Sequence, residues 1–305
     1  MGRPRSLEAQ MTHAVSRANK GSFESKANRM TMLKAIAIEL KKEYRLQKID
    51  NLKAKHVSGL VEKWKNEGRS VATIKNRVSS LRYLAKDVLE KPSMIPKNNA
   101  DLGIERREND FNTDKGWTPS DEFKSSLPEN QQIHVDLMRN IGLRYEEAAK
   151  FRPHDADKGD KIAVYWGTKG GRDREIPITN DEQRETLDRA KEYVDNHRQE
   201  SMIPREMIWK DFDNKTRNIY NDLGMTKEGI GTPHGLRHQY AQDRYEAITG
   251  WKPPAQLSKA ERIEFRATMG QVERDIDTRA RLEVSSELGH GRIDVVANYI
   301  GSWSS

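Results

Sequence analysis

The stretch PHGLRHQYA, residues 233–241, holds two histidines and an arginine within nine residues. His234 and Arg237 lie three positions apart, so they share one face of a helix that begins at Pro233, a residue favoured in the first turn. His234 and His238 could instead form a zinc pair. However, the residues between them lack the glutamate of HExxH, and an arginine beside a metal cation is unfavourable. Because the chain also has no cysteine, we expect no metal site.

Four other short segments carry side chains that could join this pair. An arginine follows a predicted helix break, a lysine lies at the tip of a predicted hairpin, a histidine follows a Leu-Gly turn, and a tyrosine comes nine residues later. These candidates are Arg144 with Glu147 one turn on, Lys169, His290 and Tyr299. Each has an ordinary explanation when taken singly, since a turn lysine is usually solvated and a lone histidine is more often structural.

Together the set has one coherent use, which is to handle a phosphodiester. Two arginines and two histidines can neutralise the charge that builds on the non-bridging oxygens, and a planar guanidinium binds two oxygens at once. A tyrosine hydroxyl can attack phosphorus when nearby cations favour the phenolate and a histidine takes its proton. A lysine can protonate the departing sugar oxygen. Such a reaction requires no metal.

These segments resemble the tyrosine recombinases, the phage-integrase family. The motifs that carry the resemblance are GLRxxE at residues 142–147, TKGG with Lys169, HGLRH at residues 234–238, LGH ending at His290, and Tyr299. Their order and spacing agree with the family, and the resemblance covers about residues 22–305. It implies a site-specific DNA recombinase or integrase, an enzyme of mobile genetic elements, that works through a covalent 3′-phosphotyrosine intermediate.

The resemblance also implies a role for each residue. Arg144 and Arg237 bind the phosphate, while His234 hydrogen-bonds it or accepts the proton of Tyr299. Lys169 is the general acid for the 5′-hydroxyl leaving group.

Three further implications concern the surroundings of the phosphate. His290 supports the phosphate, Glu147 orients the groups around it, and His238 does not contact it. The covalent link stores the energy of the broken bond, so no cofactor is implied. The implied partners are double-stranded DNA and further copies of the chain in a multimer, a tetramer on DNA, with accessory DNA-bending proteins as an option.

Two other functions stay open at this point. A type IB topoisomerase shares these residues but relaxes DNA without exchanging partners, and a non-catalytic DNA-binding protein could keep a decayed site. The compact two-part layout favours a recombinase, and the complete set of residue types counts against a decayed site.

The balance of basic and acidic residues differs between the front third of the chain and the rest. Residues 1–100 hold 22 Lys and Arg against 9 Asp and Glu, whereas the remaining 205 hold 32 against 38. A basic front half implies a polyanionic partner, usually nucleic acid. We expect a flexible basic arm at residues 1–21, a helical core-binding domain with a linker at 22–110, and a catalytic domain at 111–305.

The core-binding domain is expected to hold three helices. Apolar residues recur at helical spacing from Met30 to Tyr44, from Val57 to Trp64, and from an N-cap at Ser70 to Val88. The third helix carries a basic stripe that we predict to contact DNA, formed by Lys75, Arg77, Arg82 and Lys86. Residues 91–103, rich in Pro, Asn and Lys, are predicted to be the linker.

The catalytic domain, like the whole chain, is expected to be mostly helical, with one small antiparallel sheet. A hairpin is predicted from Ile162 to Ile178, with its turn at Lys169-Gly170-Gly171. Helices are then predicted at residues 181–197, 212–223, 233–248, 258–283 and 292–300. We find no membrane-span or signal-peptide pattern, and we expect a cytoplasmic, DNA-associated protein.

The separation of Arg237 from His290 is longer than the family usually shows, so residues 250–285 resemble an insertion. Its apolar residues, Ile263, Met269, Val272 and Ile276, are spaced roughly as one helical face. Because only residues 300–305 follow Tyr299, too few for a useful exchanged helix, we expect this insertion either to couple subunits or to pack on its own domain.

Overall fold

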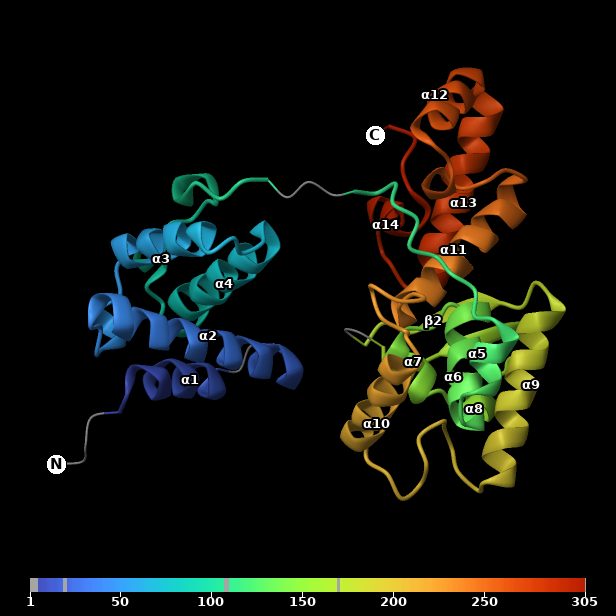
Figure 1. The fold of residues 1–305 in the computed structure, drawn as a ribbon, viewed down its shortest axis with the longest axis horizontal. Helices are drawn as coiled ribbons and strands as arrows, with labels where there is room; N and C mark the ends of the chain where they lie inside the picture. Colours follow the sequence, from blue (N-terminus) through green and yellow to red (C-terminus); the bar gives the residue numbers. More distant parts are fainter. Residues whose placement is uncertain (1–4, 19–20, 107–109, 169–170, 305) are drawn as a thin grey trace. The chain divides into compact units, whose positions relative to one another are not determined.

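The structure is a computed structural model that describes residues 5–18, 21–106, 110–168 and 171–304. It is mostly helical, and its described part contains one two-stranded sheet, which confirms the expected fold class. Two compact units, Met1–Asn109 and Asp110–Ser305, make up the chain (Figure 1). None of the helices in the described ranges combines the length and the apolar character that a bilayer crossing requires.

The N-terminal unit is a bundle of helices around one apolar core. Its α-helices are α1 (Leu7–Arg17), α2 (Phe23–Tyr44), α3 (Ala54–Asn66) and α4 (Val71–Tyr83). A π-helical turn, Leu84–Val88, continues α4, and 3₁₀ turns cover Ile49–Asn51, Pro92–Met94 and Ala100–Leu102. Ser70 caps α4 as expected, because its hydroxyl accepts a hydrogen bond from the backbone N–H of Thr73 at 3.2 Å.

The expected flexible arm at residues 1–21 is wrong over most of its described length, because residues 7–17 form α1. Leu7, Met11 and Val15 have no exposed surface. They lie four residues apart, so they fall on one face of the helix, and α1 packs against α2. This apolar repeat in the sequence indicates a helix, whereas the basic composition of the same segment is typical of a flexible arm.

The expected linker at residues 91–103 also belongs largely to this unit. Ile95, Leu102 and Ile104 are buried in its core. Burial of these apolar side chains lowers the free energy of the folded unit even though the stretch around them is rich in Pro and Asn. A linker can therefore begin only after Ile104.

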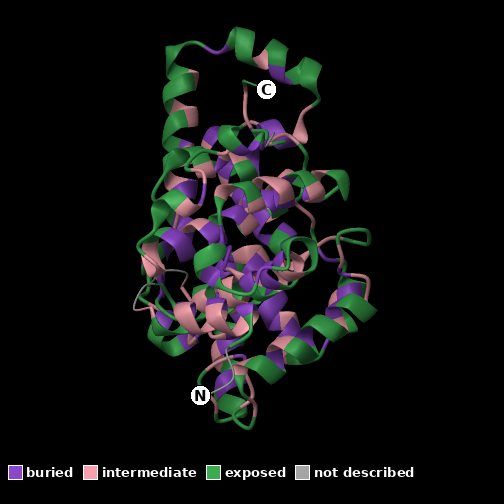
Figure 2. Ribbon diagram, turned by 90° about the vertical axis from the view of Figure 1, so that its left-hand side faces the viewer, coloured by how far each residue is buried: buried purple, intermediate pink, exposed green. Residues whose placement is uncertain are grey.

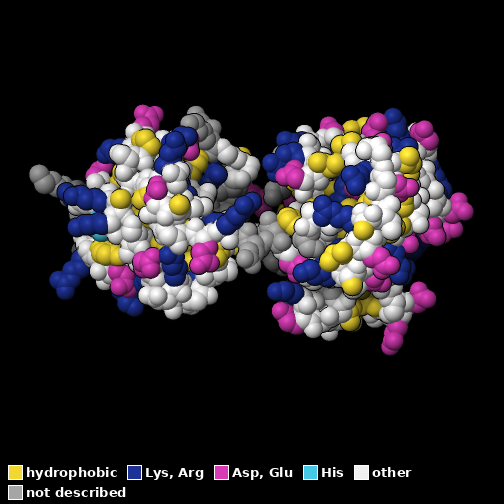
Figure 3. All heavy atoms as spheres, turned by 90° about the horizontal axis from the view of Figure 1, so that it is seen from above, with side chains coloured by type: hydrophobic (Ala, Val, Ile, Leu, Met, Phe, Trp, Pro, Cys, Tyr) yellow, Lys and Arg dark blue, Asp and Glu magenta, His cyan; other side chains and the backbone are white. Residues whose placement is uncertain are grey.

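Two arginines of the predicted basic stripe are held by their own unit. Arg77 forms an ion pair with Glu39 at 2.7 Å, and Arg82 donates to Oδ1 of Asn99 at 2.7 Å. Figure 3 shows basic and acidic side chains interspersed over the visible face of each unit. Both guanidiniums are therefore partly occupied within their own unit, and contact of the stripe with DNA stays a prediction.

The C-terminal unit is built around α11 (Pro233–Thr249), which packs against α6, α13 and α14. Pro233 occupies its first turn, as expected. The other helices are α5 (Asp121–Ser125), α6 (Glu129–Asn140), α7 (Tyr145–Ala149), α8 (Pro153–Ala156), α9 (Asp181–Asn196), α10 (Trp209–Asp222), α12 (Lys259–Thr268), α13 (Gln271–Glu287) and α14 (Ala297–Ile300), with 3₁₀ turns at Pro254–Gln256 and Ile293–Val295.

The predicted hairpin is present as strands β1 (Lys161–Val164) and β2 (Arg174–Pro177). They pair antiparallel, with Val164 opposite Arg174. The segment that follows β1 lies close to α7: a Cβ on Gly167 would be 2.9 Å from the carbonyl oxygen of Glu146. Lys169 and Gly170 of the predicted turn lie outside the described residues.

The single helix predicted at residues 258–283 is two helices, α12 and α13. The first helix ends before Met269, and Gly270 is the N-cap of the second helix. The N–H of Gly270 donates to the carboxylate of Glu273 at 2.9 Å. Both helices lie at one end of this unit (Figure 1), and their outer surfaces are mostly exposed (Figure 2). The predicted single apolar face is therefore wrong: Met269 is 7% exposed, whereas Ile263 and Val272 are 60% and 66% exposed.

Candidate active site

Two of the predicted arginines converge on one backbone carbonyl. Arg144 donates from Nη2 to the carbonyl oxygen of Leu288 at 3.1 Å, and Nη2 of Arg237 donates to the same oxygen. Nη1 of Arg237 reaches the carbonyl of Gly142, where the chain adopts φ 69° and a Cβ would lie 2.3 Å from the ring of Tyr240. A glycine is therefore required at the helix break that places Arg144 beside Arg237.

A buried carboxylate holds this cluster of cations together. Glu147 has no exposed surface and accepts hydrogen bonds from Arg144 at 2.6 Å and from Arg174 at 2.9 and 2.7 Å. Arg237 lies 4.0 Å from the same carboxylate. Burial by itself would raise the pKa of Glu147, but the hydrogen bonds and charges of Arg174 and Arg144 lower it to about 2. Three guanidiniums thus share one negative charge, which leaves excess positive charge for an anion.

Tyr299 lies beside this cluster. Its hydroxyl is 3.2 Å from Nε2 of His290, and the side chain is almost wholly buried. The ring centroid of His238 is 4.6 Å from that of Tyr299, and the centroid of His234 is 5.5 Å away. Arg237 lies 5.7 Å from the same ring centre. Five of the six predicted catalytic residues are therefore neighbours, and the sixth, the lysine of the hairpin turn, is not described.

The histidines are poised to be neutral at physiological pH. Burial, followed by the charges of Arg237, Arg144 and Arg174, lowers the pKa of His290 to about 4. His234 keeps an exposed edge, but the protein atoms around the rest of its ring and the charge of Arg237 still lower its pKa. A neutral imidazole keeps one ring nitrogen free to accept a hydrogen bond or a proton, and Nε2 of His290 is the nitrogen that contacts the Tyr299 hydroxyl.

Burial also governs the charge of Arg237. It lowers the pKa of this guanidinium to about 10, which leaves the side chain protonated at neutral pH. Within the described residues, Nε of Arg237 is buried without a hydrogen-bond partner. A buried donor of this kind is costly unless something binds it, and a phosphate oxygen is a suitable acceptor.

Sequence reasoning missed two cations of this site. Arg174 opens β2 and is 9% exposed. Lys115 lies in the segment before α5, and its carbonyl oxygen would be 2.6 Å from a Cβ on Gly235 of α11. Lys115, Trp117, His234 and His238 help to line a cavity of about 480 Å³. A basic residue after a hairpin turn was the only signal for Arg174. In the described ranges, no group of three or more His, Asp and Glu side chains is placed to hold a metal ion.

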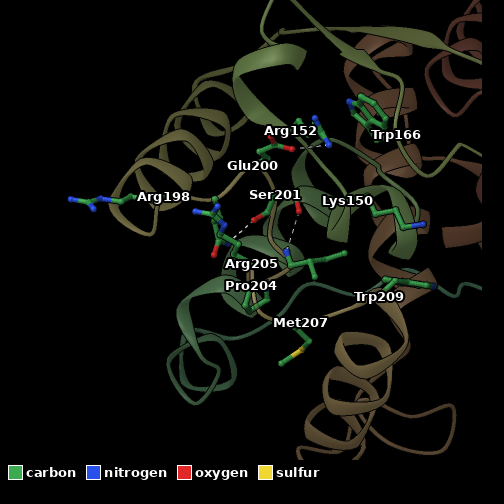
Figure 4. Close-up of a pocket in the computed structure, with 12 residues that line it drawn as sticks. Lys150, Arg152, Trp166, Arg198, Glu200, Ser201, Pro204, Arg205, Met207 and Trp209 are labelled. Atoms are coloured by element: carbon green, nitrogen blue, oxygen red, sulfur yellow. Dashed lines mark hydrogen bonds and ion pairs between the residues drawn. The ribbon is translucent and has the colours of Figure 1, made fainter.

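A second pocket, of about 650 Å³, lies at the other end of α7 from Arg144 (Figure 4). It combines basic and aromatic side chains with one acidic side chain, Glu200, whose carboxylate pairs with Arg152 at 2.8 Å. The guanidinium of Arg152 lies 4.2 Å from the ring centre of Trp166, and Nζ of Lys150 lies 5.1 Å from that of Trp209. Surfaces with this composition suit nucleic-acid backbones and bases.

Family models match both units. A model described as "Integrase" matches residues 123–243, and a model described as "Phage integrase, N-terminal" matches residues 5–88. A comparison with curated proteins found no match.

Solved structures share the fold. A lambda integrase dimer bound to a COC′ core site gives a TM-score of 0.62 at 16% identity, over 99% of this chain and 97% of that chain. The Tn1549 transposon integrase in complex with transposon right-end DNA gives 0.57 at 16% identity, over 97% and 94%. A lambda integrase tetramer bound to a Holliday junction gives 0.62 at 14% identity, over 99% and 79%.

Proposed function

The chain belongs to the phage-integrase family of tyrosine recombinases, and from this premise we propose that it cleaves and rejoins DNA at specific sites through a covalent bond to Tyr299. One observation carries the assignment of the nucleophile. The Tyr299 hydroxyl lies 3.2 Å from a histidine nitrogen and beside a cluster in which three guanidiniums share one carboxylate. An anion drawn to that excess charge would meet the tyrosine oxygen.

The cleavage step follows from this arrangement. The phenolic oxygen of Tyr299 attacks phosphorus, an O–P bond forms, and the bond from phosphorus to the 5′ oxygen breaks. The phenolic proton passes to Nε2 of His290, which we favour over His234 because it is the nitrogen in contact with the hydroxyl. Lys169, the general acid implied by the family resemblance, gives a proton to the 5′ oxygen. Attack by a 5′-hydroxyl reverses these transfers and rejoins the strand.

The arginines stabilise the transition state. A guanidinium has five N–H groups, and the hydrogen bonds described above use two on each of the Arg144 and Arg237 side chains. The remaining N–H groups can bind non-bridging oxygens whose charge grows during the attack. Glu147 holds these guanidiniums in place without entering the reaction.

The partner is duplex DNA, and we infer that the N-terminal unit supplies much of the affinity through its excess of basic residues. We propose that the pocket near Trp166 and Trp209 gives the DNA a further contact (Figure 4). The related lambda integrase forms a tetramer on a Holliday junction, and we propose the same assembly here. The location that fits this substrate is cytoplasmic and DNA-associated.

Covalent trapping tests the proposal. The protein is incubated with a pool of random-sequence duplexes, and the products are separated on a denaturing gel, where a phosphotyrosine link appears as a slow band. Sequencing the trapped DNA then gives the cleaved site. Tyr299→Phe removes only the nucleophilic oxygen, so this variant should retain DNA binding and form no adduct.

Other results would change the assigned nucleophile or reject the proposed function. An adduct in Tyr299→Phe would move the nucleophile to another tyrosine, although Tyr240 and Tyr245 are engaged with the carboxylates of Glu287 and Asp277. Relaxation of supercoiled plasmid by a monomer, without strand exchange, would indicate a topoisomerase. Sequence-specific binding that never gives an adduct in the wild-type protein would leave only a DNA-binding function.

A further inference from the structure

The segment that follows Tyr299 is fastened to the α12–α13 insertion. The ring of Trp303 stacks on Phe265 of α12, with ring centroids 5.0 Å apart and planes at 22°. Its indole N–H donates to Oδ1 of Asp277, on α13, at 3.0 Å. Trp251 packs on Phe265 with centroids 5.5 Å apart. The insertion thus holds Trp303 by stacking and by one hydrogen bond to a charged acceptor.

The backbone between Tyr299 and Trp303 has further anchors. Arg281 of α13 donates to the carbonyl of Gly301 at 3.1 Å, and Oδ1 of Asn112 accepts from the N–H of Ser302 at 2.8 Å. Gly301 has φ 85°, and a Cβ there would lie 2.4 Å from the backbone nitrogen of Ala255. The chain can make this close approach only with glycine.

Gln242 of α11 anchors Tyr299 itself. It is fully buried, and its Nε2 donates to the carbonyl of Tyr299 at 3.2 Å and to Oδ1 of Asp114 at 2.8 Å. Its Oε1 accepts from Gln256 at 2.9 Å. One side chain therefore ties the backbone of the nucleophile to the segment before α5 and to the 3₁₀ turn that precedes α12.

These anchors matter because α14 has four residues. A helix of this length is not stable by itself, and an error of about 1 Å in the position of a reacting group can cost about 100-fold in rate. We propose that the α12–α13 insertion is a positioning device for Tyr299, with Trp303 as its latch. This inference rests on the proposed function of Tyr299. Of the two expectations for the insertion, it favours packing on its own domain over coupling between subunits.

The test removes the latch at a half-buried position. Trp303→Ala loses both the stacking and the hydrogen bond, whereas Trp303→Phe keeps the stacking on Phe265. The matched control, Ile263→Ser, changes a residue of the same insertion whose side chain is 60% exposed. The substrate is the duplex recovered by covalent trapping, with a nick just beyond the cleaved phosphate so that the released fragment diffuses away.

Three quantities are measured for each protein: the single-turnover rate of adduct formation, the dissociation constant for intact duplex, and the melting temperature. We expect Trp303→Ala to form adduct about 10- to 100-fold more slowly, with the other two quantities near their wild-type values. Trp303→Phe should regain most of the rate, and Ile263→Ser should match the wild type.

Two results would overturn the inference. Wild-type rates in Trp303→Ala would show that the latch does not position the nucleophile. Rates that fall in parallel with the melting temperature in both Trp303 variants would make it an ordinary packing residue. An absence of adduct in the wild-type protein is a different outcome, because it rejects the proposed function and not the role of the latch.

Discussion

The guanidinium of Arg174 donates two hydrogen bonds to the carboxylate of Glu147, at 2.9 and 2.7 Å. Both side chains are buried, and Nε of Arg174 also donates to the carbonyl of Glu287 at 2.7 Å. The pair joins the β hairpin to α7 and to the end of α13. It therefore fixes the loop after α13, which carries His290, relative to the helix that begins beside Arg144.

Replacing Arg174 should destabilise the catalytic unit. Arg174→Met would leave a buried carboxylate with one of its ion-pair partners gone, so we expect the free energy of unfolding to fall by roughly 3–5 kcal/mol. The control is Lys161→Met, which breaks an exposed pair with Glu175 in the same sheet and should leave the free energy of unfolding almost unchanged. Urea unfolding measures both, and equal losses would contradict a special role for the buried pair.

Local signals explain which parts of this site were predictable. Pro233 in the first turn of α11 and the glycine break before Arg144 act within a few residues, so the sequence alone indicates them. Arg174 meets Glu147 across 27 positions of sequence, and only tertiary packing brings the two together. A charged residue after a hairpin turn looks solvated until the fold buries it.

The same distinction explains the errors in the fold. Residues 1–21 are basic, which is typical of a flexible arm, but the four-residue spacing of Leu7, Met11 and Val15 is that of one helical face. The break between α12 and α13 falls at Met269 and Gly270, which both have extended backbone, within a stretch whose other residues suit a continuous helix. The partner of Arg82 is Asn99, 17 residues on, in a stretch whose composition indicated a linker.

The two arginines that share the carbonyl of Leu288 should affect cleavage far more than binding. Arg144→Ala or Arg237→Ala removes contacts to one phosphate among many, and the value of those contacts lies in the transition state. We expect adduct formation to fall by about 100-fold or more while the dissociation constant for DNA changes only a few-fold. Gel-shift binding and single-turnover cleavage measure the two effects. A parallel fall in both would make these arginines ordinary phosphate contacts.

Buried histidines should make the catalytic unit sensitive to acid. His134 has no exposed surface and bonds to Tyr220 and to the carbonyl of Tyr145, both at 2.8 Å. Burial lowers its pKa to about 4. The unfolded chain, with a histidine pKa of about 6.5, binds more protons between these values. Its contribution to stability is therefore complete above pH 6.5 and is lost as the pH falls towards 4.

Urea unfolding at pH 7 and pH 5 measures this dependence. We expect His134→Gln to lose less stability than the wild type on going to pH 5, by an amount on the order of 1–2 kcal/mol. His154→Gln, which changes a side chain that is 54% exposed, is the control and should keep the wild-type slope. The explanation is wrong if His134→Gln shows the wild-type slope as well.

The basic residues of α4 and the turn after it should divide into two classes. Arg82 bonds to the carbonyl of Pro96 at 2.9 Å as well as to Asn99, so Arg82→Gln should lower the melting temperature of the N-terminal unit and leave the salt dependence of DNA binding unchanged. Lys75 and Lys86 are the stripe residues that we still expect to reach phosphates. Each phosphate contact adds about 0.9 to the slope of log K against log salt, so the Lys75→Gln/Lys86→Gln double variant should reduce that slope by roughly 2 without loss of stability. Binding titrations between low and moderate salt, on the trapped duplex and on an unrelated one, measure the slope. Both duplexes should show the same reduction, because phosphate contacts carry no sequence information directly.

An unchanged slope in the double variant would mean that the two lysines face solvent. A flattened slope in Arg82→Gln would mean that the Arg82 side chain leaves its hydrogen bonds within the domain and contacts DNA.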